Sequence, residues 1–139
     1  MLVAILVRGL IKVDTEVKDT LHMLRLNRKN HCVVVKKDQI GMLRKARSLI
    51  TWGEINDDVL KKMVAKRGRL VGNKKIDPSD VDKILENVKS KKSKEWGIKP
   101  VFRLSPPSKG FRKSIRYHYP KGELGDRGEK INELLLRMI

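Results

Sequence analysis

Cations and aromatic rings concentrate in one stretch of the chain, residues 97–122. The stretch holds seven lysines and arginines and no acidic residue, together with both phenylalanines and both tyrosines of the protein. Four of the five prolines also lie here and exclude a continuous helix. A segment of this composition cannot bury enough apolar surface to fold alone, and its like charges repel one another. We therefore predict an extended basic arm that lies on a polyanion; the alternative is a solvated loop without a partner.

The side chains of this arm suit single-stranded or irregular RNA. Arginine binds phosphates through its guanidinium fork, and Phe111, Tyr117 and Tyr119 offer flat faces on which bases stack. Residues 101–104 have the pattern of a short strand that tethers the arm, so Phe102 is expected in the core. For the other three rings, RNA contact and packing against the body remain equally open. The candidate RNA-binding residues of the arm are Arg103, Lys109, Phe111, Arg112, Lys113, Arg116, Tyr117, Tyr119 and Lys121.

A second basic group is expected in the first part of the chain. Two of its cations lie in the turn before residue 31, and three lie on or after a helix expected near residue 40. Close to the strand ends these side chains would form one RNA-binding surface, although each alone is more often a solvated residue. These candidates are Arg28, Lys29, Arg44, Lys45 and Arg47.

The sequence contains no constellation typical of catalysis or metal binding. His31 and Cys32 are adjacent, but neighbouring strand residues point to opposite faces of a sheet, so their side chains diverge. No CxxC or HxxxH spacing accompanies them. The glycine-spaced stretch at residues 67–72 lacks the pattern of a phosphate-binding loop. We expect no catalytic residue, no metal, no cofactor and no small-molecule substrate.

The formal net charge of +17 limits the class of partner. Charge of this size destabilises a compact state by self-repulsion and indicates a polyanionic partner, with nucleic acid ahead of an acidic membrane surface. The apolar opening run, residues 2–7, is too short to cross a membrane, and no basic segment precedes it as in a signal peptide. The single cysteine, Cys32, excludes an intramolecular disulfide framework and fits a reducing compartment.

The elements that position the first basic group follow from hydrophobic periodicity. Apolar runs rich in β-branched residues predict strands at residues 2–7, 31–35 and 48–52. Helical spacing predicts a helix after Asp14 and a shorter one after Asp38. Residues 1–55 therefore form a β-α-β-α-β unit.

Three further helices are expected in the remainder of the chain. The first ends at Gly68, which we expect in a left-handed conformation. The second begins at Asp77 and Pro78 and has the clearest amphipathic pattern in the sequence. The third begins at Asp126, with Glu129 placed for a capping box.

Short motifs along the chain occur in a specific combination. They are Arg8-Gly9, Asn30-His31-Cys32, Gly41-Met42, Trp52-Gly53-Glu54, Arg103-Leu104-Ser105-Pro106-Pro107 followed by Gly110-Phe111, and Gly122-Glu123-Leu124-Gly125. In this combination the whole chain resembles the archaeal and eukaryotic long form of the large-subunit ribosomal protein family called L-thirty. Ser105 departs from the family pattern, which has histidine before the prolines, so no role is assigned to that side chain.

The resemblance implies an α+β fold. Its core is a β-α-β-α-β unit with a small antiparallel three-stranded sheet, similar to a ferredoxin fold, and a helical extension and the basic arm follow. Short bacterial relatives stop after the core. The resemblance thus divides the chain into an RNA-binding core at residues 1–55 and an extension at residues 56–139, which contains the arm and the C-terminal helix.

The resemblance also implies a structural, non-enzymatic constituent of the large ribosomal subunit in the cytoplasm. Its partners would be large-subunit ribosomal RNA, close to the 5S ribosomal RNA, and neighbouring ribosomal proteins, with no membrane contact. A DNA-coating architectural protein is one alternative, which would use apolar wedges in a minor groove. A small RNA-processing factor is the other, and its activity would depend on His31, Cys32 or His118.

Overall fold

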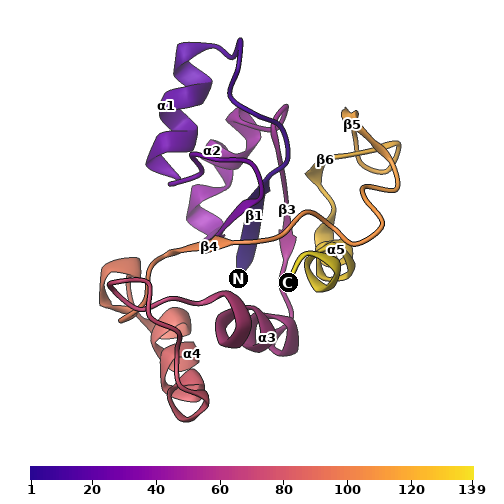
Figure 1. The fold of residues 1–139 in the computed structure, drawn as a ribbon. Helices are drawn as coiled ribbons and strands as arrows, with labels where there is room; N and C mark the ends of the chain where they lie inside the picture. The colour runs from indigo at the N-terminus through magenta and orange to yellow at the C-terminus, as the bar shows by residue number, and fades with distance from the viewer.

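One mixed sheet of six strands organises the protein in the computed structural model, which describes residues 1–139 (Figure 1). In spatial order the strands are β4-β2-β1-β3-β6-β5. Their bounds are β1 Leu2–Leu6, β2 His31–Val35, β3 Ile50–Glu54, β4 Val101–Arg103, β5 Ser114–His118 and β6 Gly122–Asp126. The α-helices are α1 Thr15–Met23, α2 Ile40–Lys45, α3 Asp57–Arg67, α4 Val81–Ser90 and α5 Ile131–Met138.

The three strands of the first 55 residues form the centre of this sheet. Strand β1 is buried along its whole length and pairs antiparallel with β2 on one side and β3 on the other. Such burial on both faces explains the continuous apolar run of its sequence. The predicted α+β fold with an antiparallel β-α-β-α-β core is confirmed. Strand β3 extends to Glu54, so Gly53 lies inside the strand rather than after it.

Side chains of β1 alternate between two apolar layers. Leu2, Ala4 and Leu6 pack with residues of α1 and α2. Val3 and Ile5 face the other way and pack with residues of α3, α4 and α5. This period of two is the ordinary geometry of a strand. Helices α3, α4 and α5 therefore cover the sheet face opposite the one that α1 and α2 cover (Figure 1).

Strands from the second half of the chain also cover both edges of the central three-stranded unit. Strand β4 pairs antiparallel with β2, with Phe102 opposite Cys32, and this confirms the strand expected at the start of the arm. Strand β6 pairs parallel with β3, with Gly125 opposite Thr51, and β5 pairs irregularly with β6. Neither β5 nor β6 was predicted: β5 is mostly exposed and has no apolar run, and Gly122 and Gly125 interrupt the apolar pattern of β6.

Two predicted helix ends are wrong in detail. Gly68 has extended backbone angles, φ −62° and ψ 142°, instead of a left-handed conformation. Glycine is required there by close packing, because a Cβ atom would clash with the backbone carbonyl oxygen of Val64 and would also lie 2.5 Å from Cδ1 of Ile76. Asp126 ends β6, and its carboxylate accepts a hydrogen bond from the Gly128 amide at 2.9 Å. No side chain caps α5, so Glu129 forms no capping box there.

Candidate nucleic-acid interface

The last helix holds the first part of the basic arm. The amide of Ser105 donates to the carbonyl of Met138, and the amide of Ser108 donates to the carbonyl of Arg137, both at 3.0 Å. The Arg137 guanidinium in turn donates to the carbonyls of Ser108, at 2.9 Å, and Gly110. These bonds tie residues 105–110 to the C-terminal end of α5, so the arm is not a free tail.

A buried ion pair holds the last part of the arm. The side chains of Arg127 and Glu123 are only 6% and 5% exposed, and their charged atoms lie 2.6 Å apart. Arg127 Nε also donates to Thr51 Oγ1 at 2.9 Å, which joins the pair to central strand β3. The other carboxylate oxygen of Glu123 accepts the amide of Lys113 at 2.9 Å. The pair therefore connects the arm directly to the sheet.

The arm presents five cations with exposed side chains, two of which, Lys113 and Lys121, have their ammonium groups over tyrosine rings. Lys109, Arg112, Lys113, Arg116 and Lys121 are all exposed. None of the seven ion pairs of the protein includes any of them. Their charge is therefore uncompensated, and the anchors hold it on a defined surface. Such a surface lowers the entropic cost of meeting a polyanion.

The aromatic residues of the arm have three different environments. Phe102 is fully buried in the core, as expected. Phe111 packs, partly buried, against the apolar layer that contains α5. The half-buried ring of Tyr119 lies 4.8 Å from Lys113 Nζ and 5.7 Å from the Arg127 guanidinium. Tyr117 is 52% exposed, with Lys121 Nζ at 4.6 Å from its ring. Tyr117 thus presents the most accessible face for base stacking.

The candidate cations of residues 1–55 are exposed but lie on separate elements. Arg28 and Lys29 precede β2, whereas Arg44 and Lys45 belong to α2 and Arg47 follows it. No hydrogen bond or ion pair connects the two sets. Lys45 pairs instead with Glu16 of α1 at 3.6 Å, and both side chains are well exposed.

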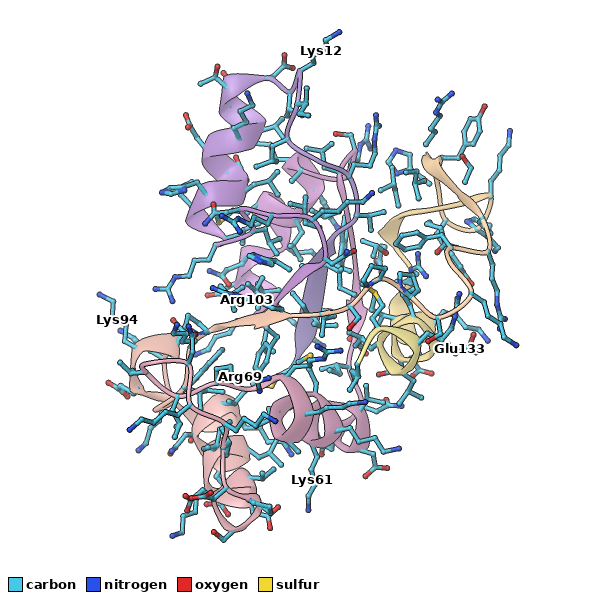
Figure 2. All side chains as sticks on the ribbon, viewed as in Figure 1. Lys12, Lys61, Arg69, Lys94, Arg103 and Glu133 are labelled. Carbon is cyan, nitrogen blue, oxygen red and sulfur yellow. The ribbon has the colours of Figure 1, made fainter.

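Two adjoining hollows along β4 contain basic residues that the sequence reasoning did not single out. They share Lys99, Val101 and Arg103, and together we call them the β4 groove. The charged and titratable side chains that line it are Arg25, His31, Arg67, Arg69, Lys99 and Arg103. Arg103 thus lies with this groove rather than with the arm's outer cations (Figure 2). Two of these cations lie in the Arg67-Gly68-Arg69 segment, whose basic, glycine-spaced pattern is visible in the sequence. That pattern does not match a nucleotide-binding loop, and it does not show that the segment meets β4.

Burial and positive neighbours set the protonation of His31. Burial, the charge of Arg103 and then the charge of Arg28 lower the pKa of His31 from its ordinary value of 6.5. The two arginines that disfavour the imidazolium, Arg103 and Arg28, also attract phosphate groups. The lowered pKa favours the neutral imidazole, so the positive charge of the groove comes from its arginines and its lysine.

His31 and Cys32 do not act together. Cys32 lies fully buried on the opposite face of β2, with its Sγ 3.9 Å from Met63 Sδ, and burial raises the pKa of its thiol. No three histidine, cysteine or acidic side chains are close enough to hold a metal ion. No helix has the length and apolar character needed to span a bilayer.

The fold and these surfaces define an α+β protein that presents exposed cations at both edges of a mixed sheet. The family described as ribosomal protein L30p/L7e matches residues 2–50 of the chain. The large ribosomal subunit protein uL30 of Nanoarchaeum equitans is 42% identical, over 96% of this chain and 95% of its own length. The uL30 proteins of Methanosphaera stadtmanae and Methanobrevibacter smithii are 39% and 42% identical, over the full length of both chains in each comparison.

The chain therefore belongs to the uL30 family of ribosomal proteins. The resemblance seen in the sequence motifs is confirmed over essentially the whole length. Members of this family are structural components of the ribosome, so the expectation that the chain is not an enzyme is confirmed by its family.

Proposed function

We propose that this protein is a structural constituent of the large subunit of the cytoplasmic ribosome, where it binds and stabilises ribosomal RNA. Family membership supports the placement in the subunit. The observation that carries RNA binding is the arm, in which five exposed cations lie between two anchors without an acidic partner. Counterions released from RNA phosphates by these cations would supply much of the binding free energy.

The arm would read the shape and phosphate positions of the RNA more than its sequence. Duplex RNA hides its base edges in a deep, narrow groove, so side chains meet phosphates and unpaired bases instead. Arg112 and Arg116 supply guanidinium forks, and Tyr117 supplies the exposed ring. The half-buried rings Phe111 and Tyr119 would contribute chiefly by shaping the surface.

The cations of residues 1–55 would form a second part of the RNA contact. In this proposal the β-α-β-α-β unit is the RNA-binding core and residues 56–139 are an extension that adds the arm. Arg28 and Lys29 before β2, and Arg44, Lys45 and Arg47 around α2, meet phosphates of neighbouring RNA segments. The site in the subunit would lie near the 5S ribosomal RNA, beside other ribosomal proteins.

Salt dependence of RNA binding tests the role of the arm. An arm variant carries Arg112→Gln, Lys113→Gln, Arg116→Gln and Lys121→Gln; a matched control carries Lys18→Gln, Lys62→Gln, Lys91→Gln and Lys94→Gln, which are exposed cations elsewhere. Both lose four charges. The probe is protein-free large-subunit ribosomal RNA from a related archaeon. If all four arm cations meet phosphates, the slope of log affinity against log salt becomes shallower by about 3, from about 0.7 per single-strand phosphate.

An arm variant with the same slope as the control would refute the role of the arm. Sedimentation of a cell extract tests the placement separately. The protein should migrate with the large subunit, and RNase but not DNase should abolish this. Release by DNase would favour the DNA-coating alternative.

A further inference from the structure

A second basic surface lies at the opposite edge of the sheet from the tip of the arm. Strands β4 and β5 are the two edge strands, with four strands between them. At a spacing of about 4.8 Å between strands, the two edges are roughly 24 Å apart. This separation is about three times the Debye length of about 8 Å at physiological salt. Charges at the β4 groove and at the arm tip therefore attract anions independently.

The cations of the β4 groove come from three separate parts of the chain, and hydrogen bonds within the protein hold Arg67, Arg69 and Lys99. The amide of Lys99 donates to the carbonyl of Arg69 at 2.8 Å, which joins the segment before β4 to the loop after α3. Lys99 Nζ donates to Asn73 Oδ1 at 2.6 Å, and Arg69 Nη1 donates to the Gly68 carbonyl at 2.9 Å. Arg67 donates to Ser105 Oγ. Figure 2 shows Arg103 and Arg69 on either side of β4.

The groove also lacks negative charge. No aspartate or glutamate lines either hollow, and none of the seven ion pairs includes Arg25, Arg67, Arg69, Lys99 or Arg103. Half of the ten residues that line the two hollows are arginine or lysine, and only Val101 and Pro100 are apolar, unlike the apolar lining of a small-molecule pocket. Several fixed cations along one strand edge fit a chain of phosphates better than a single small anion.

We infer that the β4 groove binds the phosphate backbone of a second RNA segment, so that one protein chain bridges two RNA segments. The inference rests on the proposed function, because it assigns a second contact to the same RNA-binding protein. The part of the arm from Lys109 to Lys121 holds one segment at the β5 edge of the sheet, and the groove holds the other at the β4 edge. The six-stranded sheet then acts as a rigid spacer between them.

Hydroxyl-radical footprinting on protein-free large-subunit ribosomal RNA tests the inference. A groove variant carries Arg67→Gln, Arg69→Gln, Lys99→Gln and Arg103→Gln, and it is compared with the arm variant and the four-charge control described above. The wild type should protect two separate sets of nucleotides. The groove variant should lose one set and the arm variant the other, and each slope of log affinity against log salt should become shallower by up to about 3.

A milder variant guards against misfolding, because Arg67 and Arg69 also make hydrogen bonds within the protein. Arg25→Gln with Arg103→Gln changes two exposed side chains, and it should weaken protection of the same set and reduce the slope by about 1.4. If both groove variants retain every protected nucleotide and the slope of the control, the inference is wrong while RNA binding by the arm stands. That result would indicate that the partner of the β4 groove is a protein instead of RNA. If the wild type protects no nucleotide, the proposed function itself fails.

Discussion

Replacement of Arg127 by methionine is expected to destabilise the protein more than any change at its exposed ion pairs. The substitution removes the guanidinium that lies 2.6 Å from the carboxylate of Glu123. It leaves a carboxylate that is 5% exposed without its counter-charge, and it also removes the hydrogen bond to Thr51. Loss of one partner from a buried ion pair costs about 3–5 kcal/mol. That is a large share of the roughly 5–15 kcal/mol that stabilises a typical domain.

A matched control lies a few residues further along. Lys130 and Glu133 also form an ion pair, at 3.5 Å, but their side chains are 62% and 69% exposed. An exposed pair contributes about 0–1 kcal/mol, so Lys130→Met should change stability little. The double variant Glu123→Gln with Arg127→Met removes the stranded charge and keeps an acceptor for the Lys113 amide. We expect it to recover part of the loss caused by Arg127→Met alone, because no charge is left buried and unpaired.

Urea unfolding of the wild type and the three variants measures these differences. The comparison requires that the free energy of unfolding falls with urea concentration at the same slope in all four proteins. Amide exchange at Lys113 gives a local measurement, because its amide donates to Glu123. Exchange there should accelerate in Arg127→Met and stay unchanged in Lys130→Met. A free energy of unfolding for Arg127→Met within the range of Lys130→Met would refute the view that this pair fastens the arm to the sheet.

Two further predictions concern pH and packing. The folded state holds the pKa of His31 below 6.5, so the unfolded chain binds a proton first as the pH falls. The free energy of unfolding should therefore decrease as the pH falls through 6.5, and this decrease should stop below the folded-state pKa. His31→Gln should remove this component of the decrease in urea titrations, and identical pH profiles for both proteins would contradict the assignment. Gly53→Ala should destabilise by about 1–3 kcal/mol, because the new Cβ would lie 2.9 Å from Ile131 and closer still to the Gly128 carbonyl. At Gly41 in α2 an added Cβ atom would have no neighbour within 4 Å, so Gly41→Ala should instead stabilise the protein by about 0.5–1 kcal/mol. Thermal unfolding measures both variants, and a change of stability with the same sign in both would show that the packing argument is wrong.

Local patterns in the sequence were sufficient for most of the elements. The run of buried residues at Leu2–Leu6 and the helical spacing in α4 depend on neighbours a few residues away, so periodicity finds them. Strand β6 depends instead on Thr51, which pairs with Gly125, and on Arg127, which reaches back to Thr51. No local pattern contains this information.

The candidate interface shows the same division. Composition alone located the acid-free arm, because its cations all lie within one stretch of 26 residues, 97–122. The β4 groove was missed because its parts meet only after folding, when the amide of Lys99 bonds to the carbonyl of Arg69. Composition also could not distinguish Tyr117 from Tyr119, since both follow arginine or histidine in a similar context and only the fold covers one ring.

Strands β4 and β6, which cover both edges of the central three-stranded unit, are synthesised late. When Glu54 leaves the ribosome that makes the chain, β2 and β3 still have open edges, and β6 follows about 70 residues later. At about 5–20 residues per second, the interval lasts roughly 4–14 s. Open edges of this kind are templates for pairing with other chains. The nascent protein therefore passes through a period in which early contact with a chaperone or with RNA would protect it from aggregation.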